Sequence, residues 1–331
     1  MAFRLVDAYD AVFFDLDGVI YLGPTAIPGV AEAISQLSEL DVPLMYVTNN
    51  AAPSAQDVVS LLNGLGLPAV LDEVLTSAQV AAEYLPRELE PGSKVLIVGS
   101  EYLAQVIELA GLVPVFSADD EPVAVIQGYN PKLNWSMLDE ATLAIERGAT
   151  WYACNDDSSR PSERGTVPGV GGGIALISTA IGGAPKTFGK PFTPMMEEAV
   201  RRTGAKRPIF VGDRVDTDIA GANAAGIDSL LVFTGVHGKA DLVSAKENAR
   251  PTAIGGCIGA LLEPPRTLTL STGGAKCGKQ LAAVRDKALV IETRPEAQAE
   301  QLDALWALAN LSWSRPGSTT TKALRALTEL K

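Results

Sequence analysis

The sequence predicts an α/β protein with a parallel-sheet core, an inserted α/β domain and a small C-terminal α+β extension. Strand-like and helix-like segments alternate over residues 1–80, a pattern typical of parallel strands joined by crossover helices. A second alternating block starts near residue 84, and the first pattern resumes at Lys186. Two consecutive prolines, Pro264 and Pro265, then stop the last helix of the core and separate the extension.

The first block is expected to contain three strands and three helices. Pro28 and Ser54 mark the starts of two helices, because proline and serine are favoured at helix N-termini. Apolar runs bounded by turn residues indicate the strands. The expected strands are 11–17, 43–50 and 74–77, and the expected helices are 27–39, 54–65 and 78–85.

The inserted block has its own strands and apolar faces, as an independent domain would. Its expected strands are 94–99, 113–116, 124–129 and 150–153, and its helices are 102–110, 135–146 and 174–181. A glycine-rich stretch over 165–173 precedes the last of these helices. It could bring backbone amides near an anion, or it could serve as a hinge or tight turn. The residues alone do not separate these two interpretations.

The last two blocks complete the domain plan. The resumed core is expected to have helices at 193–203, 216–225 and 257–262 and strands at 209–212, 229–234 and 251–254; the extension is expected to have a strand at 267–272 and helices at 279–286 and 298–311. We therefore expect a Rossmann-like core over residues 1–83 and 186–262, the inserted domain over 84–185, and the extension over 263–331. Gly273 to Lys279 has the spacing of a phosphate-binding loop, but Gln280 replaces its serine or threonine, which argues against nucleotide binding.

Two carboxylates follow the first strand-like segment directly. Asp15 and Asp17 come after a run of three apolar residues, and Gly18 closes the turn. Residues two apart on a strand start on the same side, and open α/β sheets bind ligands at the carboxyl ends of their strands. Close carboxylates repel each other unless a cation or a shared proton compensates them. For this motif alone, a solvated loop is an equally good interpretation.

Further polar residues stand where other strands of the core are expected to end. Thr48 and Asn49 follow the second strand, Lys190 precedes a helix, and Asp213 and Asp218 follow the strand that ends near residue 212. The carboxyl ends of parallel strands share one edge of a sheet, so all of these groups can converge there. A carboxylate pair, a hydroxyl, a lysine and a second acidic cluster suit Mg²⁺ and a phosphoryl group.

Composition excludes several classes of partner. The chain has 331 residues and a formal net charge of −12, which argues against nucleic acid or an anionic membrane as a main partner. Its three cysteines are isolated from one another, as expected in a reducing compartment. The N-terminal residues lack the apolar stretch of a signal peptide, so we expect a cytoplasmic protein. The single histidine, His237, is expected in a surface turn.

The four motifs together resemble those of the haloacid dehalogenase (HAD) superfamily. They are Asp15–Gly18, Thr48–Asn50, Gly189–Pro191 and Gly212–Asp218, in this order and at strand ends. The inserted block resembles the large α/β cap of the NagD-like, p-nitrophenyl phosphatase branch, with matching pieces at 129–133, 155–157 and 168–172. The resemblance covers about residues 8–260 and implies a HAD fold with a cap that sets substrate specificity.

The resemblance also implies a mechanism and a cofactor. Asp15 would attack phosphorus to form an aspartyl-phosphate, and Asp17 would act as general acid and then general base. Mg²⁺ would be held by the Asp15 carboxylate, the Asp17 carbonyl and Asp213, with support from Asp218.

The remaining motif residues would bind the phosphoryl group, Thr48 and the Asn49 amide through its oxygens and Lys190 through its charge. An acidic residue at position 17 favours phosphomonoester hydrolysis, with a phosphomutase or phosphotransferase as the alternative. The expected substrate is a small phosphorylated metabolite. The resemblance favours glycerol 3-phosphate, and phosphoglycolate, pyridoxal 5′-phosphate and nucleotide monophosphates stay open, as does homo-oligomerisation.

Overall fold

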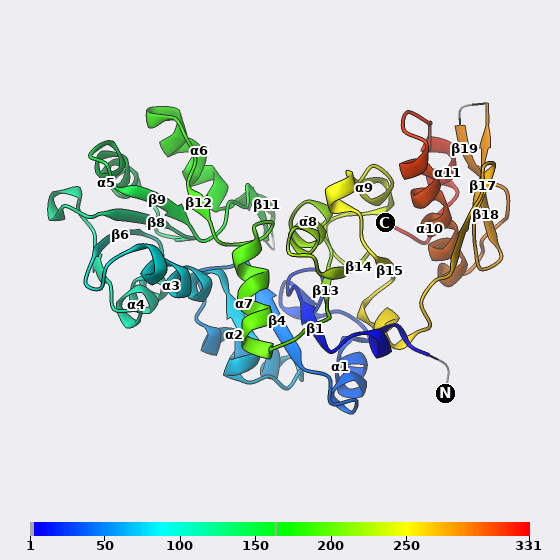
Figure 1. The fold of residues 1–331 in the computed structure, drawn as a ribbon, viewed down its shortest axis with the longest axis horizontal. Helices are drawn as coiled ribbons and strands as arrows, with labels where there is room; N and C mark the ends of the chain where they lie inside the picture. The colour runs from blue at the N-terminus through cyan, green and yellow to red at the C-terminus, as the bar shows by residue number, and fades with distance from the viewer. Residues whose placement is uncertain (1–2, 163, 287) are drawn as a thin grey trace. The chain divides into compact units, whose positions relative to one another are not determined.

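The computed structural model describes residues 3–162, 164–286 and 288–331 (Figure 1). The chain divides into two compact units, one formed by Met1–Leu44 with Thr203–Lys331 and the other by Met45–Arg202. Among the residues described, no helix combines the length and the apolar character that crossing a membrane requires.

The first unit is built on four parallel strands in the order β15-β14-β13-β1. Their bounds are β1 Ala11–Phe14, β13 Pro208–Gly212, β14 Asp228–Val232 and β15 Ala253–Gly255. Strands β1 and β13 are buried along their whole length, which explains their continuous apolar runs. Phe14 lies opposite Val211, and β13 continues one residue further to Gly212, so the residues that follow the two strands, Asp15 and Asp213, leave the sheet at the same edge.

Short helices and one hairpin surround this sheet. They are η1 Leu5–Ala8, α1 Val30–Ser38, the π-helical turn η4 Val215–Ile219, α8 Ala220–Ala224, α9 Lys239–Val243, η5 Glu247–Ala249, η6 Ile258–Leu262, and the hairpin of β2 Tyr21–Leu22 with β3 Thr25–Ala26. Helix α1 buries Val30, Ala33, Ile34 and Leu37, which recur at helical spacing.

The C-terminal extension forms a four-stranded antiparallel sheet with two helices. Its elements are β16 Leu268–Leu270, β17 Gly274–Cys277, β18 Gln280–Arg285, β19 Ala288–Ile291, α10 Gln298–Ser314 and α11 Thr321–Arg325. Helix α10 lies along this sheet (Figure 1), and its buried side chains form one core with Ala275, Ala282 and Leu289. The expected α+β extension is therefore present.

One local interpretation of the extension was wrong. The expected helix over 279–286 is strand β18, and the glycine-rich stretch before it is strand β17 and a hairpin turn. Residues 280–285 have good helix propensity, but pairing with two strands and packing of Ala282 against α10 outweigh that preference. Gly278, with φ = 54°, and Lys279 form the turn of the hairpin between β17 and β18, so no helix follows Lys279 as it would in a phosphate-binding loop.

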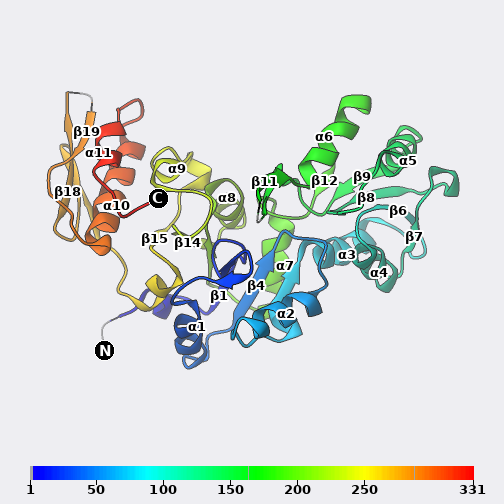
Figure 2. The ribbon, with the colours of Figure 1, turned by 180° about the vertical axis from the view of Figure 1, so that it is seen from behind.

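The second unit contains a parallel strand pair and a five-stranded parallel sheet (Figure 2). The pair is β4 Leu44–Thr48 with β5 Val74–Thr76, accompanied by α2 Ala55–Gly64, η2 Leu71–Glu73 and α3 Ser77–Glu88. The larger sheet has the order β12-β9-β8-β6-β7, with β6 Lys94–Val98, β7 Val113–Val115, β8 Ala124–Gln127, β9 Thr150–Ala153 and β12 Lys186–Thr187.

Helices cover both faces of the five-stranded sheet, α3 and α4 on one side and α5 and α6 on the other (Figures 1 and 2). The remaining bounds are α4 Glu101–Leu109, η3 Ala118–Asp120, α5 Trp135–Glu146, α6 Val170–Ile181, α7 Thr193–Thr203 and the antiparallel hairpin β10 Ser159–Ser162 with β11 Gly165–Pro168. The hairpin was not expected from the sequence, because its residues carry no alternating apolar pattern.

Candidate active site

Three buried carboxylates meet at the carboxyl edge of the first unit's sheet. Asp15, Asp213 and Asp218 each offer one oxygen, and these oxygens all lie within 4.8 Å of one another. Asp15 follows β1, whereas Asp213 and Asp218 follow the adjacent strand β13. The strand-end rule therefore explains how residues about 200 positions apart in the chain come together here.

The turn after β1 holds Asp15 and Asp17 in place. The Asp15 N–H donates to the Val211 carbonyl at 2.9 Å, and the Gly18 N–H donates to the Tyr21 carbonyl at 2.7 Å. Gly18 has φ = 86°, a left-handed conformation that favours glycine. Burial, together with the charges of Asp17 and Asp15, raises the pKa of Tyr21 well above its ordinary value. Tyr21 therefore stays protonated beside two acidic residues.

Backbone amides fix the two carboxylates that follow β13. The Asp218 Oδ2 accepts hydrogen bonds from the N–H groups of Asp213 and Arg214, both at 3.1 Å. The Asp213 Oδ2 accepts a hydrogen bond of 2.5 Å from the Val236 N–H. These amide donors fix the positions of the Asp213 and Asp218 carboxylates.

The carboxylate cluster fits a hard divalent cation. Three buried carboxylates held within 4.8 Å repel one another, and burial increases that repulsion, so an added positive charge stabilises the group. Mg²⁺ prefers oxygen ligands and accepts one or two carboxylates with water or substrate oxygens completing its octahedron. The residues present therefore match the magnesium site that the sequence predicts.

In the second unit, Asn49 connects the end of β4 to Lys190. The Lys190 N–H donates to Asn49 Oδ1 at 2.8 Å, and Asn49 Nδ2 donates back to the Lys190 carbonyl at 3.0 Å. Lys190 is buried, and the Asn50 N–H donates to the Thr48 hydroxyl at 3.1 Å. The structure thus brings together two of the predicted phosphoryl-binding residues, Asn49 and Lys190, with the Asn49 side chain acting as the connection.

The loop after β9 joins the same network. Asn155 Nδ2 donates to the Asn49 carbonyl at 2.7 Å, and Asn49 Nδ2 also donates to Asp157 Oδ2 at 3.1 Å. Gly169 and Gly171 lie so close to this loop that a Cβ at either position would fall 2.2 Å and 2.5 Å from the carbonyls of Asp157 and Asp156. The glycine-rich stretch therefore permits close backbone packing, and the Gly171 N–H is committed to the Asp157 carbonyl.

Several contacts of the acidic cluster could not be inferred from its motifs. His237 is 18% exposed and not on an open surface turn, because its Nδ1 accepts a hydrogen bond of 2.9 Å from the Val215 N–H. Gly235 packs against the Asp213 carboxylate, and the Thr234 hydroxyl donates to the Gly18 carbonyl at 2.5 Å. The loop after β14 was missed because nothing in its composition links it to Asp213.

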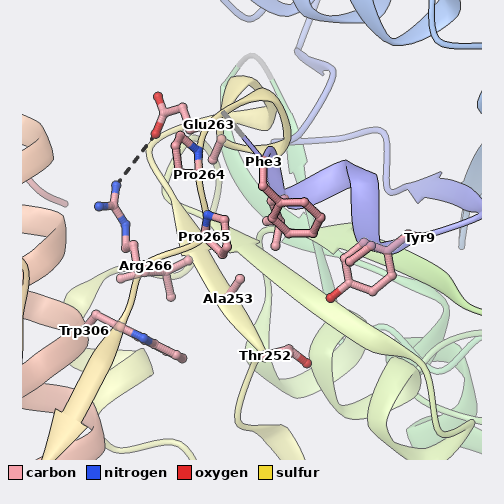
Figure 3. A pocket seen from close by; sticks show the side chains of 13 residues that line it. Phe3, Tyr9, Thr252, Ala253, Glu263, Pro264, Pro265, Arg266 and Trp306 are labelled. Atoms are coloured by element: carbon pink, nitrogen blue, oxygen red, sulfur yellow. Dashed lines mark ion pairs between the residues drawn. The ribbon is translucent and has the colours of Figure 1, made fainter. Parts of the chain in front are cut away.

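A separate cavity of about 220 Å³ lies elsewhere in the first unit (Figure 3). It is lined by the segment from Phe3 to Tyr9, by β15, by the linker Glu263–Arg266 and by Trp306. The Arg266 guanidinium forms ion pairs with Asp303 and, at 4.0 Å, with Glu263. None of the residues predicted for catalysis lines this cavity. Its charged residues, Glu263 and Arg266, form an ion pair, which is typical of a structural contact.

Family models match both parts of the predicted core. A model described as haloacid dehalogenase-like hydrolase matches residues 12–113, and one described as HAD-hydrolase-like matches residues 187–256. The D-glycerol 3-phosphate phosphatase of Mycobacterium tuberculosis is 43% identical over 267 residues, covering 81% of this chain and 75% of that protein. The chain belongs to the haloacid dehalogenase-like hydrolase family.

Further similar proteins are also phosphatases by name. An acid sugar phosphatase of Staphylococcus saprophyticus is 37% identical over 74% of this chain and 93% of that protein. The crystal structure of a Mycobacterium tuberculosis glycerol phosphate phosphatase with magnesium has a TM-score of 0.87 and 37% identity, covering 98% of both chains. A p-nitrophenyl phosphatase of Archaeoglobus fulgidus has a TM-score of 0.71 and 31% identity, covering 77% of this chain and 98% of that one.

These comparisons confirm the HAD family, its NagD-like branch and the α/β fold predicted from the sequence. They also confirm a hydrolase of the phosphatase class, and the magnesium in the mycobacterial structure supports the predicted cofactor. The mycobacterial structure covers nearly the whole chain, whereas the archaeal phosphatase covers 77% of it. That the acidic cluster and the Asn49–Lys190 pair form one site stays a prediction.

Proposed function

We propose that this protein is a Mg²⁺-dependent phosphatase that hydrolyses glycerol 3-phosphate through an aspartyl-phosphate. The buried cluster of Asp15, Asp213 and Asp218 at a sheet edge carries the proposal. Such a cluster suits a divalent cation, and it places the Asp15 carboxylate beside that cation, where it could attack phosphorus. The identity of the ester rests on the mycobacterial relative, which is named for glycerol 3-phosphate and is 43% identical.

In the proposed reaction Asp15 and Asp17 have different roles. An Asp15 oxygen attacks phosphorus, the bond from phosphorus to the glycerol oxygen breaks, and Asp17 donates a proton to that oxygen. Water then attacks the aspartyl-phosphate while Asp17 accepts its proton, which releases inorganic phosphate and restores the Asp15 carboxylate. Asp17 is less buried than Asp15, as suits a residue that must exchange protons with substrate and water.

The remaining predicted residues supply charge and position. Asp15, the Asp17 carbonyl and Asp213 would hold Mg²⁺, with Asp218 supporting them, and the bound cation would neutralise charge that develops on the transferred phosphoryl oxygens. Thr48 and the Asn49 amide would hold phosphoryl oxygens, and Lys190 would neutralise their charge. The paired hydrogen bonds between Asn49 and Lys190 support a joint role, because they fix one backbone relative to the other.

We also propose a domain plan and a cellular setting for this activity. The core comprises residues 1–83 and 186–262, the cap comprises 84–185, and the extension comprises 263–331; the cap selects the substrate. The net charge of −12 supports a small phosphorylated metabolite as the partner and argues against nucleic acid. The isolated cysteines support a cytoplasmic location, and a homo-oligomer stays compatible with the proposal.

The test measures phosphate release from a panel of small esters, with Mg²⁺ and with EDTA. The panel contains glycerol 3-phosphate, phosphoglycolate, pyridoxal 5′-phosphate and a nucleotide monophosphate. Asp15→Asn should reduce kcat by about a thousandfold or more, because it removes the nucleophile. Asp72→Asn, an exposed acidic residue outside the cluster, is the matched control and should keep full activity.

Each result of the panel has a definite meaning. Metal-dependent turnover that is highest for glycerol 3-phosphate and lost in Asp15→Asn supports the full proposal. A higher kcat/KM for another ester would overturn the substrate and keep the mechanism. Transfer of phosphate from one sugar to another without release of inorganic phosphate would replace hydrolysis with a mutase or phosphotransferase reaction.

A further inference from the structure

The Asp213 carboxylate is held by the loop that follows β14. We call residues Gly235–Lys239 the Asp213 loop. Its Val236 N–H donates to Asp213 Oδ2 at 2.5 Å, and its His237 N–H donates to the Asp213 carbonyl at 3.3 Å. The position of this acidic side chain therefore depends on how the Asp213 loop is fixed in space.

The Asp213 loop is fixed in turn by residues 327–331, which we call the tail segment. Lys331 Nζ donates to the Gly235 carbonyl, and the Lys239 N–H donates to the Lys331 carbonyl at 2.8 Å. Lys239 Nζ donates to the carbonyls of Leu327 and Leu330 at 2.5 Å and 2.7 Å. The tail segment thus binds both ends of the loop, and it lies beside α9, which starts at Lys239 (Figures 1 and 2).

The tail segment is itself anchored in the core of the first unit. Leu327 and Leu330 are buried in one apolar cluster with Val215 and Ile219, which belong to the turn between Asp213 and α8. The Glu329 N–H also donates to Gln301 Oε1 of α10 at 2.9 Å. The extension is therefore packed against the acidic motif through apolar contacts and bound to the Asp213 loop through polar ones.

We infer that the extension is a positioning element of the metal site. Its tail segment holds the Asp213 loop, and the loop holds the Asp213 carboxylate in the geometry that binds a divalent cation. The inference rests on the proposed role of Asp213 as a metal ligand. It assigns a function to residues 263–331, for which the motifs of the core give none.

Lys239 is the residue through which this support is best tested. Its ammonium group satisfies two carbonyls of the tail segment, and its backbone N–H satisfies a third. Without the ammonium group, the carbonyls of Leu327 and Leu330 lose their partner, and only the backbone N–H of Lys239 still binds the tail segment at the start of α9. Partners one step beyond the ligands change metal affinity by about 10- to 100-fold; Lys239 is farther away, so we expect about a three- to tenfold loss.

The experiment compares Lys239→Met and Lys331→Met with wild type in the full chain. Lys322→Met, an exposed lysine of α11 with no hydrogen bond or ion pair among the described contacts, is the matched control. Binding of Mn²⁺ is followed through the loss of the free-ion signal in electron paramagnetic resonance, which needs no turnover. Asp213→Asn provides the benchmark for loss of the ligand itself, and thermal unfolding reports whether each variant is folded.

The expected result is weaker Mn²⁺ binding in Lys239→Met and Lys331→Met, no change in Lys322→Met, and an unchanged KM for the phosphate ester at saturating Mg²⁺. Wild-type Mn²⁺ affinity in both folded variants would overturn the inference. If Lys239→Met does not fold, the exposed Lys331 decides the question by the same criterion. If Asp213→Asn binds Mn²⁺ like wild type, the proposed metal site itself is wrong, which distinguishes that failure from failure of the inference.

Discussion

The substitution Gly235→Ala should displace the carboxylate of Asp213, the proposed metal ligand, without replacing an ionisable group. A Cβ at position 235 would lie 2.0 Å from Asp213 Oδ2 and 2.4 Å from Asp213 Cγ. The backbone φ of Gly235 is not positive, so an alanine at this position would not strain the backbone. The effect of the substitution should therefore come from the clash with Asp213 alone.

The size of the effect follows from these distances. Ordinary van der Waals contact begins at 3.4 Å, so the carboxylate oxygen must move by about 1.4 Å to admit the methyl group. A displacement of about 1 Å in a catalytic arrangement costs on the order of 100-fold in rate. Overpacking of a buried site costs about 1–3 kcal/mol in the free energy of unfolding. We expect both effects in Gly235→Ala.

The assay measures kcat, the Mg²⁺ concentration at half-maximal activity, and urea unfolding. Gly273→Ala is the control, because a Cβ at Gly273 meets no atom within 4 Å and its φ is not positive. This control should keep wild-type activity and change stability by less than about 1 kcal/mol. If Gly235→Ala has wild-type kcat and wild-type Mg²⁺ dependence, the reasoning that Gly235 leaves room for Asp213 is refuted.

Two further predictions concern stability and thiol reactivity. Burial of Glu198 alone would raise its pKa, but the hydrogen bonds and charges of Arg201 and Arg202 lower the pKa overall. The contribution of ionised Glu198 to the free energy of unfolding is therefore fully present above the unfolded-state pKa and is lost as pH falls through the folded-state pKa. Glu198→Gln should lower the free energy of unfolding by about 2 kcal/mol at pH 7, which is less than the loss of a fully buried ion pair because Arg201 is exposed. The difference in urea midpoint between wild type and Glu198→Gln should shrink below about pH 4. A difference that does not change with pH would contradict the pairing of Glu198 with the two arginines. Burial raises the pKa of the Cys154 and Cys277 thiols, whereas Cys257 is partly exposed, so Ellman's reagent should label Cys257 rapidly in the native protein and all three cysteines only in urea. If native wild type shows more rapidly labelled thiol than native Cys154→Ser, Cys154 is accessible and this prediction is wrong.

The acidic cluster could be predicted from the sequence because it depends on short-range signals. A buried apolar run ending in Asp15 and another ending in Gly212 and Asp213 indicate two strand ends, and parallel strands share one edge. The helices at 135–146 and 193–203 match α5 and α7 for a similar reason, since helical periodicity and end signals are local. These features need no knowledge of which distant segments touch.

The extension could be predicted only in outline because its structure depends on distant contacts. Residues 280–285 form strand β18 through pairing with β17 and β19 and packing on α10, and no local signal competes with their helix propensity. The bonds from Lys239 to Leu327 and Leu330 span 88 and 91 residues. The sequence assigned His237 to the surface because a lone histidine in a glycine-rich turn gives no sign of a buried partner. In the structure its Nδ1 accepts a hydrogen bond from the Val215 N–H.

The structure explains why glycine stands at positions 18 and 212 of the motifs, which the sequence alone does not. A Cβ at Gly18 would lie 2.7 Å from Asp213 Oδ2, and one at Gly212 would lie 2.2 Å from Asp218 Cβ. Together with Gly235, these residues surround the second acidic pair with backbone instead of side chains. Backbone on these sides brings the Val236 N–H close enough to donate to Asp213, and it leaves the carboxylates only a small space in which to move. Glycines therefore create the preorganised oxygen cluster, and the extension keeps one of the enclosing loops in place.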